Sequence, residues 1–186
     1  MNPQFSLERR LAYRFSVLST LNLRCIGAVY MKHFGLSHAG LRIFTIIGRY
    51  EPIFPGVAAQ RSTMDADKVT RAVDRLVELG YVIRNTDAAD RRRVILCLSS
   101  RGKSVYEEVE QLAQTMDAEW RSVLSAQENA IFDGLMDKLD AQAREIFTLE
   151  IGEKRFAHLR NSKSADKKPA AKKSGRASGA RRVAAR

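Results

Sequence analysis

Cationic side chains recur on one face of the segment 66–79 and again, a short distance along the chain, at 91–93. In the first segment Lys68, Arg71 and Arg75 follow one another at steps of three and four. Ammonium and guanidinium groups bind phosphate, and an arginine can also read a guanine through two hydrogen bonds. The chemistry that these residue types could perform is therefore recognition of a nucleic acid.

A helix from Asp65 to Gly80 would place those cations together. Val69, Val73 and Leu76 recur with helical period and form an apolar face opposite the cations. Asp65 is a typical N-cap residue, and Gly80 stands where a left-handed residue would end the helix. The pattern predicts an amphipathic helix whose outward face is basic.

Two β-rich runs, 81–83 and 94–98, follow this helix and flank the polar stretch 84–93. Such runs on either side of a polar stretch predict a two-stranded hairpin, here with arginines at its tip. A helix that can enter a major groove, followed directly by a hairpin of this kind, indicates a DNA-binding wing.

Apolar periodicity predicts further helices on both sides of this lobe. The first needs burial on two faces, so we expect it to pack against more than its own domain. We expect a first helix over about 7–33 that Gly35 ends, and a second that Ser37 caps and Glu51-Pro52 stops. A third helix is expected over 56–60, before the basic helix described above, which is the fourth. A fifth helix is capped by Ser99 or Ser100, and a sixth begins at the capping box 125–128.

The net charge of +11 over 186 residues is unevenly distributed. The segment 161–186 carries nine Lys or Arg against Asp166, which gives it +8 and leaves +3 for the other 160 residues. Its composition lacks apolar periodicity, so we expect a disordered basic tail. The tail is either a solubility extension or a sequence-independent phosphate-binding arm. The folded part must bind a polyanion through local clusters.

Cysteine, histidine and hydropathy patterns exclude several classes of protein. Cys25 and Cys97 are the only cysteines and form no CxxC motif, which favours a reducing compartment. His33, His38 and His158 lack the spacing of metal ligands. No run of about 18 apolar residues occurs, and no apolar signal region precedes the first helix. We expect a cytoplasmic protein without a membrane span, metal or other cofactor.

The order of these elements resembles the multiple antibiotic resistance regulator (MarR) family of bacterial transcription factors. Residues 68–84 resemble the family's recognition helix and first wing strand without a gap, 87–92 its wing tip, and 98–102 its hairpin-to-helix junction. The resemblance spans about 7–155 and is most specific over 65–102.

Two features depart from the family pattern. The segment 54–59 lacks the usual acidic-Leu-Ala helix, and Cys25 lies too late to match the reactive cysteine of peroxide-sensing members.

The resemblance implies a mainly α fold with a small β-hairpin wing, which is a winged helix-turn-helix with long N- and C-terminal dimerisation helices. We expect a dimerisation helix over 1–35, a DNA-binding lobe over 36–102, C-terminal dimerisation helices over 103–160 and the tail 161–186. A two-fold homodimer would present two recognition helices about 34 Å apart to double-stranded DNA with an imperfect inverted repeat. The alternative for the terminal helices is a monomeric helical core.

The candidate DNA contacts on the recognition helix are four residues. Thr70 and Arg71 lie near enough to its N-terminus to reach base edges or phosphates. Lys68 and Arg75 are assigned mainly to phosphate. The alternative is a solvated helix face.

The candidate DNA contacts on the wing are Asp90, Arg91, Arg92 and Arg93. The resemblance implies that Arg91 enters the minor groove, where negative potential is concentrated. Asp90 would repel phosphate, so we expect it to orient an arginine through a bidentate ion pair. The alternative for the arginines is a charged turn that keeps an edge strand soluble.

The resemblance also implies a small aromatic anionic ligand, bound in the crevice between dimerisation helices and DNA-binding lobe. Tyr13, Arg14, His38 and Arg42 stand on the helices that would line such a crevice. Ordinary surface or packing roles are the alternative for all four.

Together these features predict a homodimeric, sequence-specific transcriptional regulator associated with the bacterial nucleoid. We expect a repressor that leaves DNA when a ligand changes the separation of its two lobes. The alternative is an architectural nucleoid protein with little sequence preference. The sequence contains no Ser-His-Asp set, Gly-rich phosphate loop or metal-ligand spacing, which argues against an enzyme.

Overall fold

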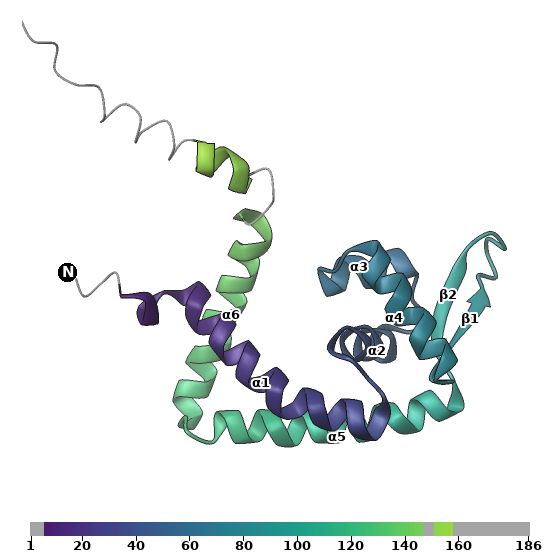
Figure 1. Ribbon diagram of the computed structural model, residues 1–186, viewed down its shortest axis with the longest axis horizontal. Coiled ribbons are helices and arrows are strands. Elements are labelled where there is room, and N and C mark those ends of the chain that lie inside the picture. The colour runs from purple at the N-terminus through teal and green to yellow at the C-terminus, as the bar shows by residue number, and fades with distance from the viewer. Residues whose placement is uncertain (1–5, 147–150, 158–186) are drawn as a thin grey trace, which may run out of the picture. The chain divides into compact units, whose positions relative to one another are not determined.

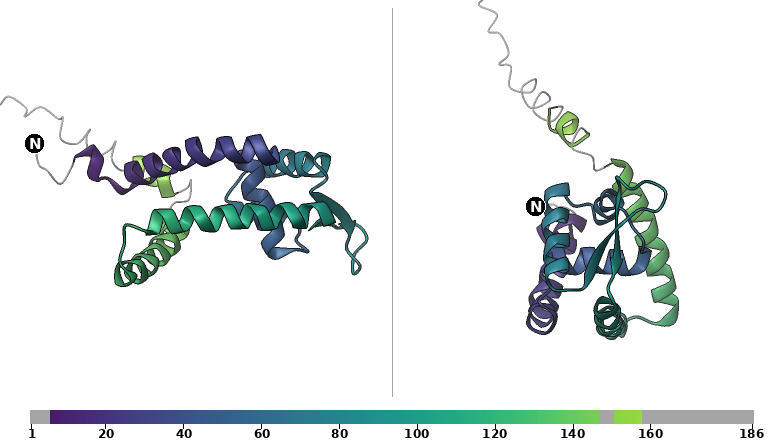
Figure 2. Two further views of the ribbon diagram at one scale, coloured as in Figure 1. Left: turned by 90° about the horizontal axis from the view of Figure 1, so that it is seen from below. Right: turned by 90° about the vertical axis from the view of Figure 1, so that its right-hand side faces the viewer.

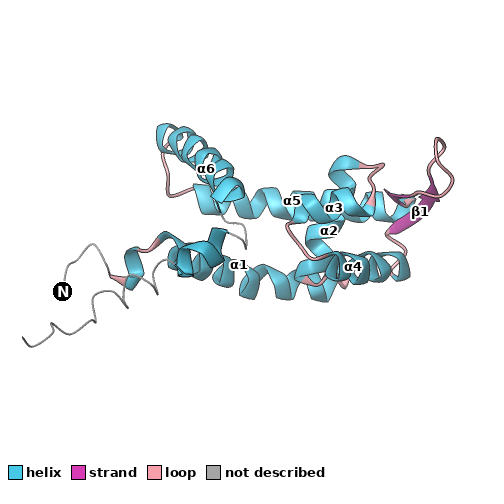
Figure 3. Ribbon diagram, turned by 90° about the horizontal axis from the view of Figure 1, so that it is seen from above, coloured by secondary structure: helices cyan, strands magenta, loops and turns pink. Residues whose placement is uncertain are grey.

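The computed structural model describes residues 6–146 and 151–157. The chain divides into two units, Met1–Ser122 and Val123–Arg186, each described here by itself. The predicted fold, mainly α with one β-hairpin, is confirmed (Figures 1 and 3). The first unit contains η2 (Leu7–Arg9), α1 (Leu11–Phe34), α2 (His38–Tyr50), α3 (Pro55–Ser62), α4 (Ala66–Glu78), β1 (Val82–Thr86), β2 (Val94–Leu98) and α5 (Ser100–Arg121), and the second contains α6 (Ala126–Ile146) and a helical stretch over 151–157.

Most helix ends are set by the capping residues that the sequence predicted. Gly35 ends α1 in the left-handed conformation, with φ 67°. The Ser37 hydroxyl accepts a hydrogen bond from the Gly40 N–H at 3.1 Å and begins α2. Ser99 begins α5 in the same way, through the Gly102 N–H at 2.9 Å. These caps satisfy backbone donors that the first turn of a helix leaves unpaired.

The capping box at the start of α6 is also confirmed. The Ser125 hydroxyl accepts from the Glu128 N–H at 3.3 Å, while the Glu128 carboxylate accepts from the Ser125 N–H at 2.8 Å. The Ser125 N–H and the Ser125 hydroxyl both donate to the Glu128 carboxylate, each at 2.8 Å, and these two bonds lower the pKa of the Glu128 carboxyl because they favour its charged form.

Two helices differ from their predicted boundaries. The helix predicted over about 7–33 is interrupted, because Arg10 has extended backbone between η2 and α1. Cations at Arg9 and Arg10 oppose the positive end of a helix dipole, which disfavours an uninterrupted start there. The third helix is longer than the predicted 56–60, because Pro55 occupies its first turn, where the fixed φ of proline suits a helix.

The hairpin is longer, and its tip shorter, than the sequence predicted. The strands pair antiparallel from Val82 opposite Leu98 to Thr86 opposite Val94, so polar residues extend β1 beyond the predicted 81–83. The tip therefore begins at Asp87 rather than at residue 84. The backbone of Ile53 also bridges to Leu96, which attaches the segment before α3 to the outer side of β2.

Helix α2 forms the centre of the core of the first unit. Its Ile43, Phe44 and Ile47 are fully buried, and α2 contacts α1, α3, α4, β2 and α5. Leu76 of α4 and Leu96 of β2 are equally buried in the same cluster. In the views of Figure 2, α2 lies between α1 and α5, with the hairpin beyond it. Burial of this apolar cluster provides most of the free energy that fixes α4 and the wing.

Tyr81, in the turn between α4 and β1, joins most of these elements. Its side chain is 4% exposed, and its hydroxyl donates to the Phe34 carbonyl at the end of α1, at 3.0 Å. Its ring lies 5.6 Å from that of Phe44, centroid to centroid, and Arg101 stacks over it at 5.2 Å. Its carbonyl accepts from the Ser99 N–H at 2.9 Å. The entry to the wing is therefore held by α1, α2 and α5 together.

Gly102 of α5 lies against the backbone of Tyr81, so a substitution there tests how closely α5 packs against the entry to the wing. A Cβ atom at this position would lie 1.9 Å from the Tyr81 carbonyl oxygen, a contact that requires the backbone to move. We expect Gly102→Ala to lower the free energy of unfolding by about 3 kcal/mol, measured by chemical denaturation at one protein concentration.

Gly134→Ala is the matched control, because a Cβ atom there meets nothing within 4 Å in α6. It should raise the free energy of unfolding by about 0.5 to 1 kcal/mol through helix propensity. Equal effects of the two substitutions would contradict the close contact at Tyr81.

Candidate nucleic-acid interface

Helix α4 turns an apolar face to the core and a basic face outward. Val69, Val73 and Leu76 are buried, as the periodicity predicted. The predicted DNA contacts on this helix are all exposed on the other side: Lys68, Thr70, Arg71 and Arg75. The geometry required for a recognition helix, with its cations free of the core, is therefore present.

The four exposed residues of α4 differ in how their side chains are engaged. Lys68 pairs with Asp65 at 2.9 Å and Arg75 with Glu78 at 2.9 Å. Both pairs are solvated, and such pairs contribute little to stability, so they can exchange for phosphate. Within the described part of the chain, the Arg71 side chain has no hydrogen-bond or ion-pair partner. Arg71 is thus the cation of α4 that is most readily available to a ligand.

Asp65 occupies the predicted N-cap position of α4 but uses its carboxylate differently. No side-chain capping bond is present at this described residue, and its carboxylate is held by Lys68 instead. The hydrogen bond from Lys68 and the charge of Lys68 lower the pKa of the Asp65 carboxyl. The Thr70 hydroxyl likewise bonds within the helix, donating to the Ala66 carbonyl at 3.0 Å.

A shallow hollow of about 250 Å³ lies between α4 and the start of α2. Lys68, Arg71 and Arg75 line one side of it, and the turn from Gly35 to Ser37 lines the other. The positive end of the α2 dipole and three cations therefore meet at one concave surface. This gathers positive charge beside the outward face of α4, as contact with a DNA backbone requires.

The wing is attached to α4 by an ion pair. Arg84 of β1 pairs with Asp74 of α4, and both groups are partly exposed. This contact joins the middle of the hairpin to α4. Neither residue was predicted to take part in a site, because a pair separated by ten positions and a turn has no sequence signature.

Hydrogen bonds to two aspartates shape the tip of the wing. The Asp87 carboxylate accepts from the Ala89 N–H, and the Asp90 carboxylate accepts from the Arg92 N–H, each at 3.0 Å. Asp90 was expected to orient an arginine by an ion pair; among the described residues it instead forms a turn with the backbone of Arg92. The short Asp side chain reaches the N–H two residues on more easily than a guanidinium.

Arg93 differs from the other two wing arginines because its side chain packs against an aromatic ring. Its guanidinium carbon lies 3.8 Å from the ring centroid of Phe54, which immediately precedes α3. Arg91 and Arg92 are exposed, and within the described residues their side chains have no ion pair or hydrogen bond. The structure thus places Arg91 and Arg92 at the free tip, and Arg93 against α3. Phe54 belongs to the segment that departs from the family pattern.

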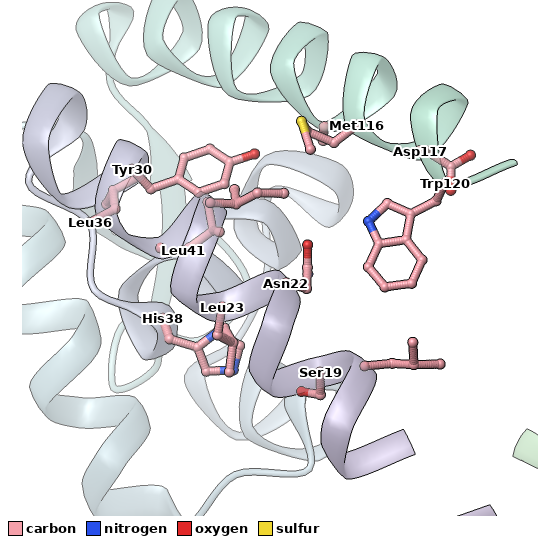
Figure 4. A pocket seen from close by; sticks show the side chains of 14 residues that line it. Ser19, Asn22, Leu23, Tyr30, Leu36, His38, Leu41, Met116, Asp117 and Trp120 are labelled. Atoms are coloured by element: carbon pink, nitrogen blue, oxygen red, sulfur yellow. The ribbon is translucent and has the colours of Figure 1, made fainter. Parts of the chain in front are cut away.

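A second cavity, of about 520 Å³, lies in the first unit between α1, α2 and α5 (Figure 4). Of the four residues predicted to bind a ligand, His38 lines it, whereas Tyr13, Arg14 and Arg42 do not. The Arg42 guanidinium lies 3.5 Å from the His38 ring and donates to the Ser62 carbonyl at 3.3 Å. Asn22 and Trp120, which also line the cavity, were not predicted, because neither belongs to a recognisable motif.

Residues 34–93 match a family model described as the MarR family. A relative, the uncharacterized HTH-type transcriptional regulator YcgE of Bacillus subtilis (strain 168), is 30% identical over 118 residues, which cover 62% of this chain and 76% of that protein. The chain belongs to the MarR family. It is therefore a winged-helix DNA-binding transcriptional regulator rather than an enzyme.

Solved structures of MarR-family proteins share the fold of this regulator. A MarR/EmrR family transcriptional regulator from Acinetobacter sp. ADP1 matches with a TM-score of 0.69 and 18% identity, over 76% of this chain and 100% of that chain. A mutant MarR from E. coli, complexed with operator DNA, matches with a TM-score of 0.60 and 26% identity, over 69% of this chain and 92% of that chain.

The described residues contain no membrane-spanning helix, metal-ligand cluster or disulfide. No helix in the described ranges is long and apolar enough to cross a membrane. No cluster of three or more potential metal ligands occurs among residues 6–146 and 151–157. Cys25 is exposed and Cys97 half-buried, and neither is in a disulfide. The predicted tail over 161–186 lies outside the described residues.

The contact between Phe54 and Arg93 can be measured by a double-mutant cycle in the free protein. Because a solvated cation–π contact contributes about 0.5 to 1 kcal/mol, we expect that coupling between Phe54→Leu and Arg93→Gln in the free energy of unfolding. Phe54→Tyr keeps an aromatic face and should preserve the coupling. If the coupling were zero, and Arg93→Gln weakened DNA binding as much as Arg91→Ala, Arg93 would instead be a DNA contact.

Proposed function

We propose that this MarR-family regulator is a homodimeric, sequence-specific repressor that a small ligand releases from DNA. The observation that carries the proposal is the outward basic face of α4 beside a wing tip with two free arginines, Arg91 and Arg92. Arg71 and Thr70 would read bases in the major groove, while Lys68 and Arg75 bind phosphate. Arg91 would enter the adjacent minor groove, with Arg92 on the backbone.

Exposed apolar residues on α1 support dimerisation through a second copy of the chain. Leu11 and Leu21 are each 53% exposed, and Phe15 and Leu18 also face solvent. In the second unit, α6 exposes Ile131, Phe132 and Leu135. Monomeric proteins rarely expose apolar stripes of this extent, and a two-fold partner would cover the same stripe on each copy. The segments 1–35 and 103–160 would then supply the dimer interface.

The cavity between α1, α2 and α5 supports the ligand response. It is bounded by α2, which is the centre of the DNA-binding lobe, and by α1 and α5, which lead to the proposed dimer interface. A ligand that fits one arrangement of these helices better than another shifts the population toward that arrangement. Release of DNA requires that the favoured arrangement hold the two recognition helices at a distance that does not match the spacing of the two half-sites on DNA.

The alternative function is an architectural nucleoid protein that coats DNA with little preference for sequence. The charge of +8 on residues 161–186 favours this reading, because a cluster of cations binds phosphate regardless of base. A repressor and a coating protein differ in their preference for DNA sequence, so competition with shuffled DNA distinguishes the two functions.

We expect the full chain to keep a preference of about 10³-fold or more for its genomic site over a shuffled duplex of the same composition. The site would be obtained by footprinting, and the preference measured by competition at fixed salt. Deletion of 161–186 is the control, and should weaken binding to both duplexes by the same factor and reduce the salt dependence. Loss of preference in the full chain would favour the architectural reading, and a changed preferred sequence after deletion would contradict the role given to the tail.

Arg91→Ala should weaken binding to the specific site about tenfold, because a guanidinium is lost from a narrow groove. Lys172→Ala, which removes one of several interchangeable cations of the tail, should cost less than about threefold. Titration of both variants at one salt concentration gives the comparison. Equal losses would mean that the wing contributes only diffuse charge.

A further inference from the structure

The recognition helix carries carboxylates among its cations. Over the segment 65–78, four carboxylates stand against three cations, which gives this segment a net charge of −1. The carboxylates are Asp65, Asp67, Asp74 and Glu78. A helix that bound a polyanion through charge alone would be expected to have an excess of cations. The acidic residues of α4 therefore need an explanation of their own.

Asp67 is the carboxylate of this segment that has no partner within the described part of the chain. The other three are accounted for by the ion pairs described above, with Lys68, Arg75 and Arg84. Asp67 is exposed, and among the described residues its side chain forms no ion pair or hydrogen bond. Its two carboxylate oxygens are thus available to accept hydrogen bonds from a ligand.

Asp67 lies in the first turn of α4, on the side that is turned away from the core. Residues two positions apart on an α-helix point about 160° apart, so Asp67 points away from the buried Val69. Arg71, four residues on, lies on the same face as Asp67. The N-terminal residues of a recognition helix are those that contact base edges. With α4 docked as proposed, the Asp67 carboxylate faces the bases beside the guanidinium of Arg71.

A carboxylate in the major groove has few favourable partners. An ionised carboxylate only accepts hydrogen bonds, and phosphate oxygens, guanine O6 and N7, and thymine O4 are acceptors as well. The N4 amino group of cytosine is a donor, from which Asp and Glu side chains accept. Adenine has an amino group too, but its N7 acceptor lies beside it. Cytosine therefore satisfies the carboxylate best, and the other bases leave it desolvated without a good partner.

We propose that Asp67 is a specificity-determining residue, which selects a cytosine in each half-site by accepting a hydrogen bond from the N4 amino group. The inference rests on the proposed sequence-specific function and adds a base contact that no cation can make. Arg71 donates to a guanine, whereas Asp67 accepts from a cytosine. Two residues one turn apart would therefore read two nearby bases of opposite hydrogen-bonding character.

Comparison of the full chain with Asp67→Ala tests the contact. Sites selected from a random DNA library by the full chain should contain a preferred cytosine in each half-site. Replacing that cytosine by thymine in one half-site should weaken binding by the full chain about tenfold. The same replacement should cost Asp67→Ala less than about twofold, because the acceptor is absent. Equal costs in the two proteins, or selected sites without a preferred cytosine, would overturn the proposal.

Binding to a shuffled duplex distinguishes base reading from a structural role of Asp67. An acidic residue in the first turn also stabilises a helix through the helix dipole, so its loss could weaken binding to every duplex. If Asp67 reads a base, Asp67→Ala should bind the shuffled duplex about twofold more tightly, because repulsion of phosphate is removed, while it binds the selected site less tightly. Weaker binding to both duplexes would show a structural role and refute the base contact.

Glu78→Gln is the matched control. Residues 67 and 78 are eleven apart and point in nearly the same direction, but Glu78 lies at the other end of α4 and pairs with Arg75. Glu78→Gln frees Arg75, so it should change the affinity for all duplexes by one factor and keep the preferred cytosine. Loss of that preference in Glu78→Gln would mean that the charge of the helix, rather than a contact of Asp67, sets it.

The base preferences also separate this inference from the proposed function. If the full chain selects no sequence, the sequence-specific function itself fails. If the full chain selects a sequence and Asp67→Ala selects the same one, only the contact of Asp67 fails. If Asp67→Ala loses a preferred guanine and keeps the cytosine, Asp67 acts by positioning Arg71, and the cytosine contact is refuted.

Discussion

The position of the wing relative to the recognition helix depends on the burial of Tyr81. This residue stands where the chain leaves α4 for β1, and its ring and hydroxyl are held by Phe44 of α2 and the Phe34 carbonyl of α1. Its backbone also fixes the start of α5 through Ser99 and leaves no room for a side chain at Gly102. One aromatic residue therefore joins the hairpin and α4 to α1, α2 and α5. Such a junction is needed when two elements must fit two grooves of a duplex at once.

Beyond this junction, the wing is held by weaker contacts. The pair of Arg84 with Asp74 and the stack of Arg93 on Phe54 are both solvated, and each contributes little energy by itself. The backbone bridge from Ile53 to Leu96 adds directional hydrogen bonds on the other side of β2. The wing is thus well anchored at its base and progressively less constrained toward Arg91 and Arg92. That gradient would suit the proposed entry of Arg91 into a minor groove, because the tip could then adjust to the width of the groove.

Local signals in the sequence were sufficient for most of the fold. Caps such as Ser37, Ser99 and Ser125, and the helical period of Val69, Val73 and Leu76, act within one turn, so they can be read without tertiary structure. The exposed cations of α4 followed from the same period. Contacts between distant segments could not be read in this way, which is why the roles of Phe54, Asp74 and the lining residue Trp120 emerged only from the structure.

The two candidate surfaces of the first unit meet at the turn between α1 and α2. Leu36, which is 1% exposed, lines both the large cavity and the hollow beside α4 that gathers Lys68, Arg71 and Arg75. Lys68, Arg71 and Arg75 line the hollow and are not among the residues that line the cavity. Coupling between the proposed ligand site and the proposed DNA-binding surface would run through the placement of Leu36 and the start of α2. A packed side chain shared by two surfaces is a short route for such coupling, because closely packed atoms transmit displacement.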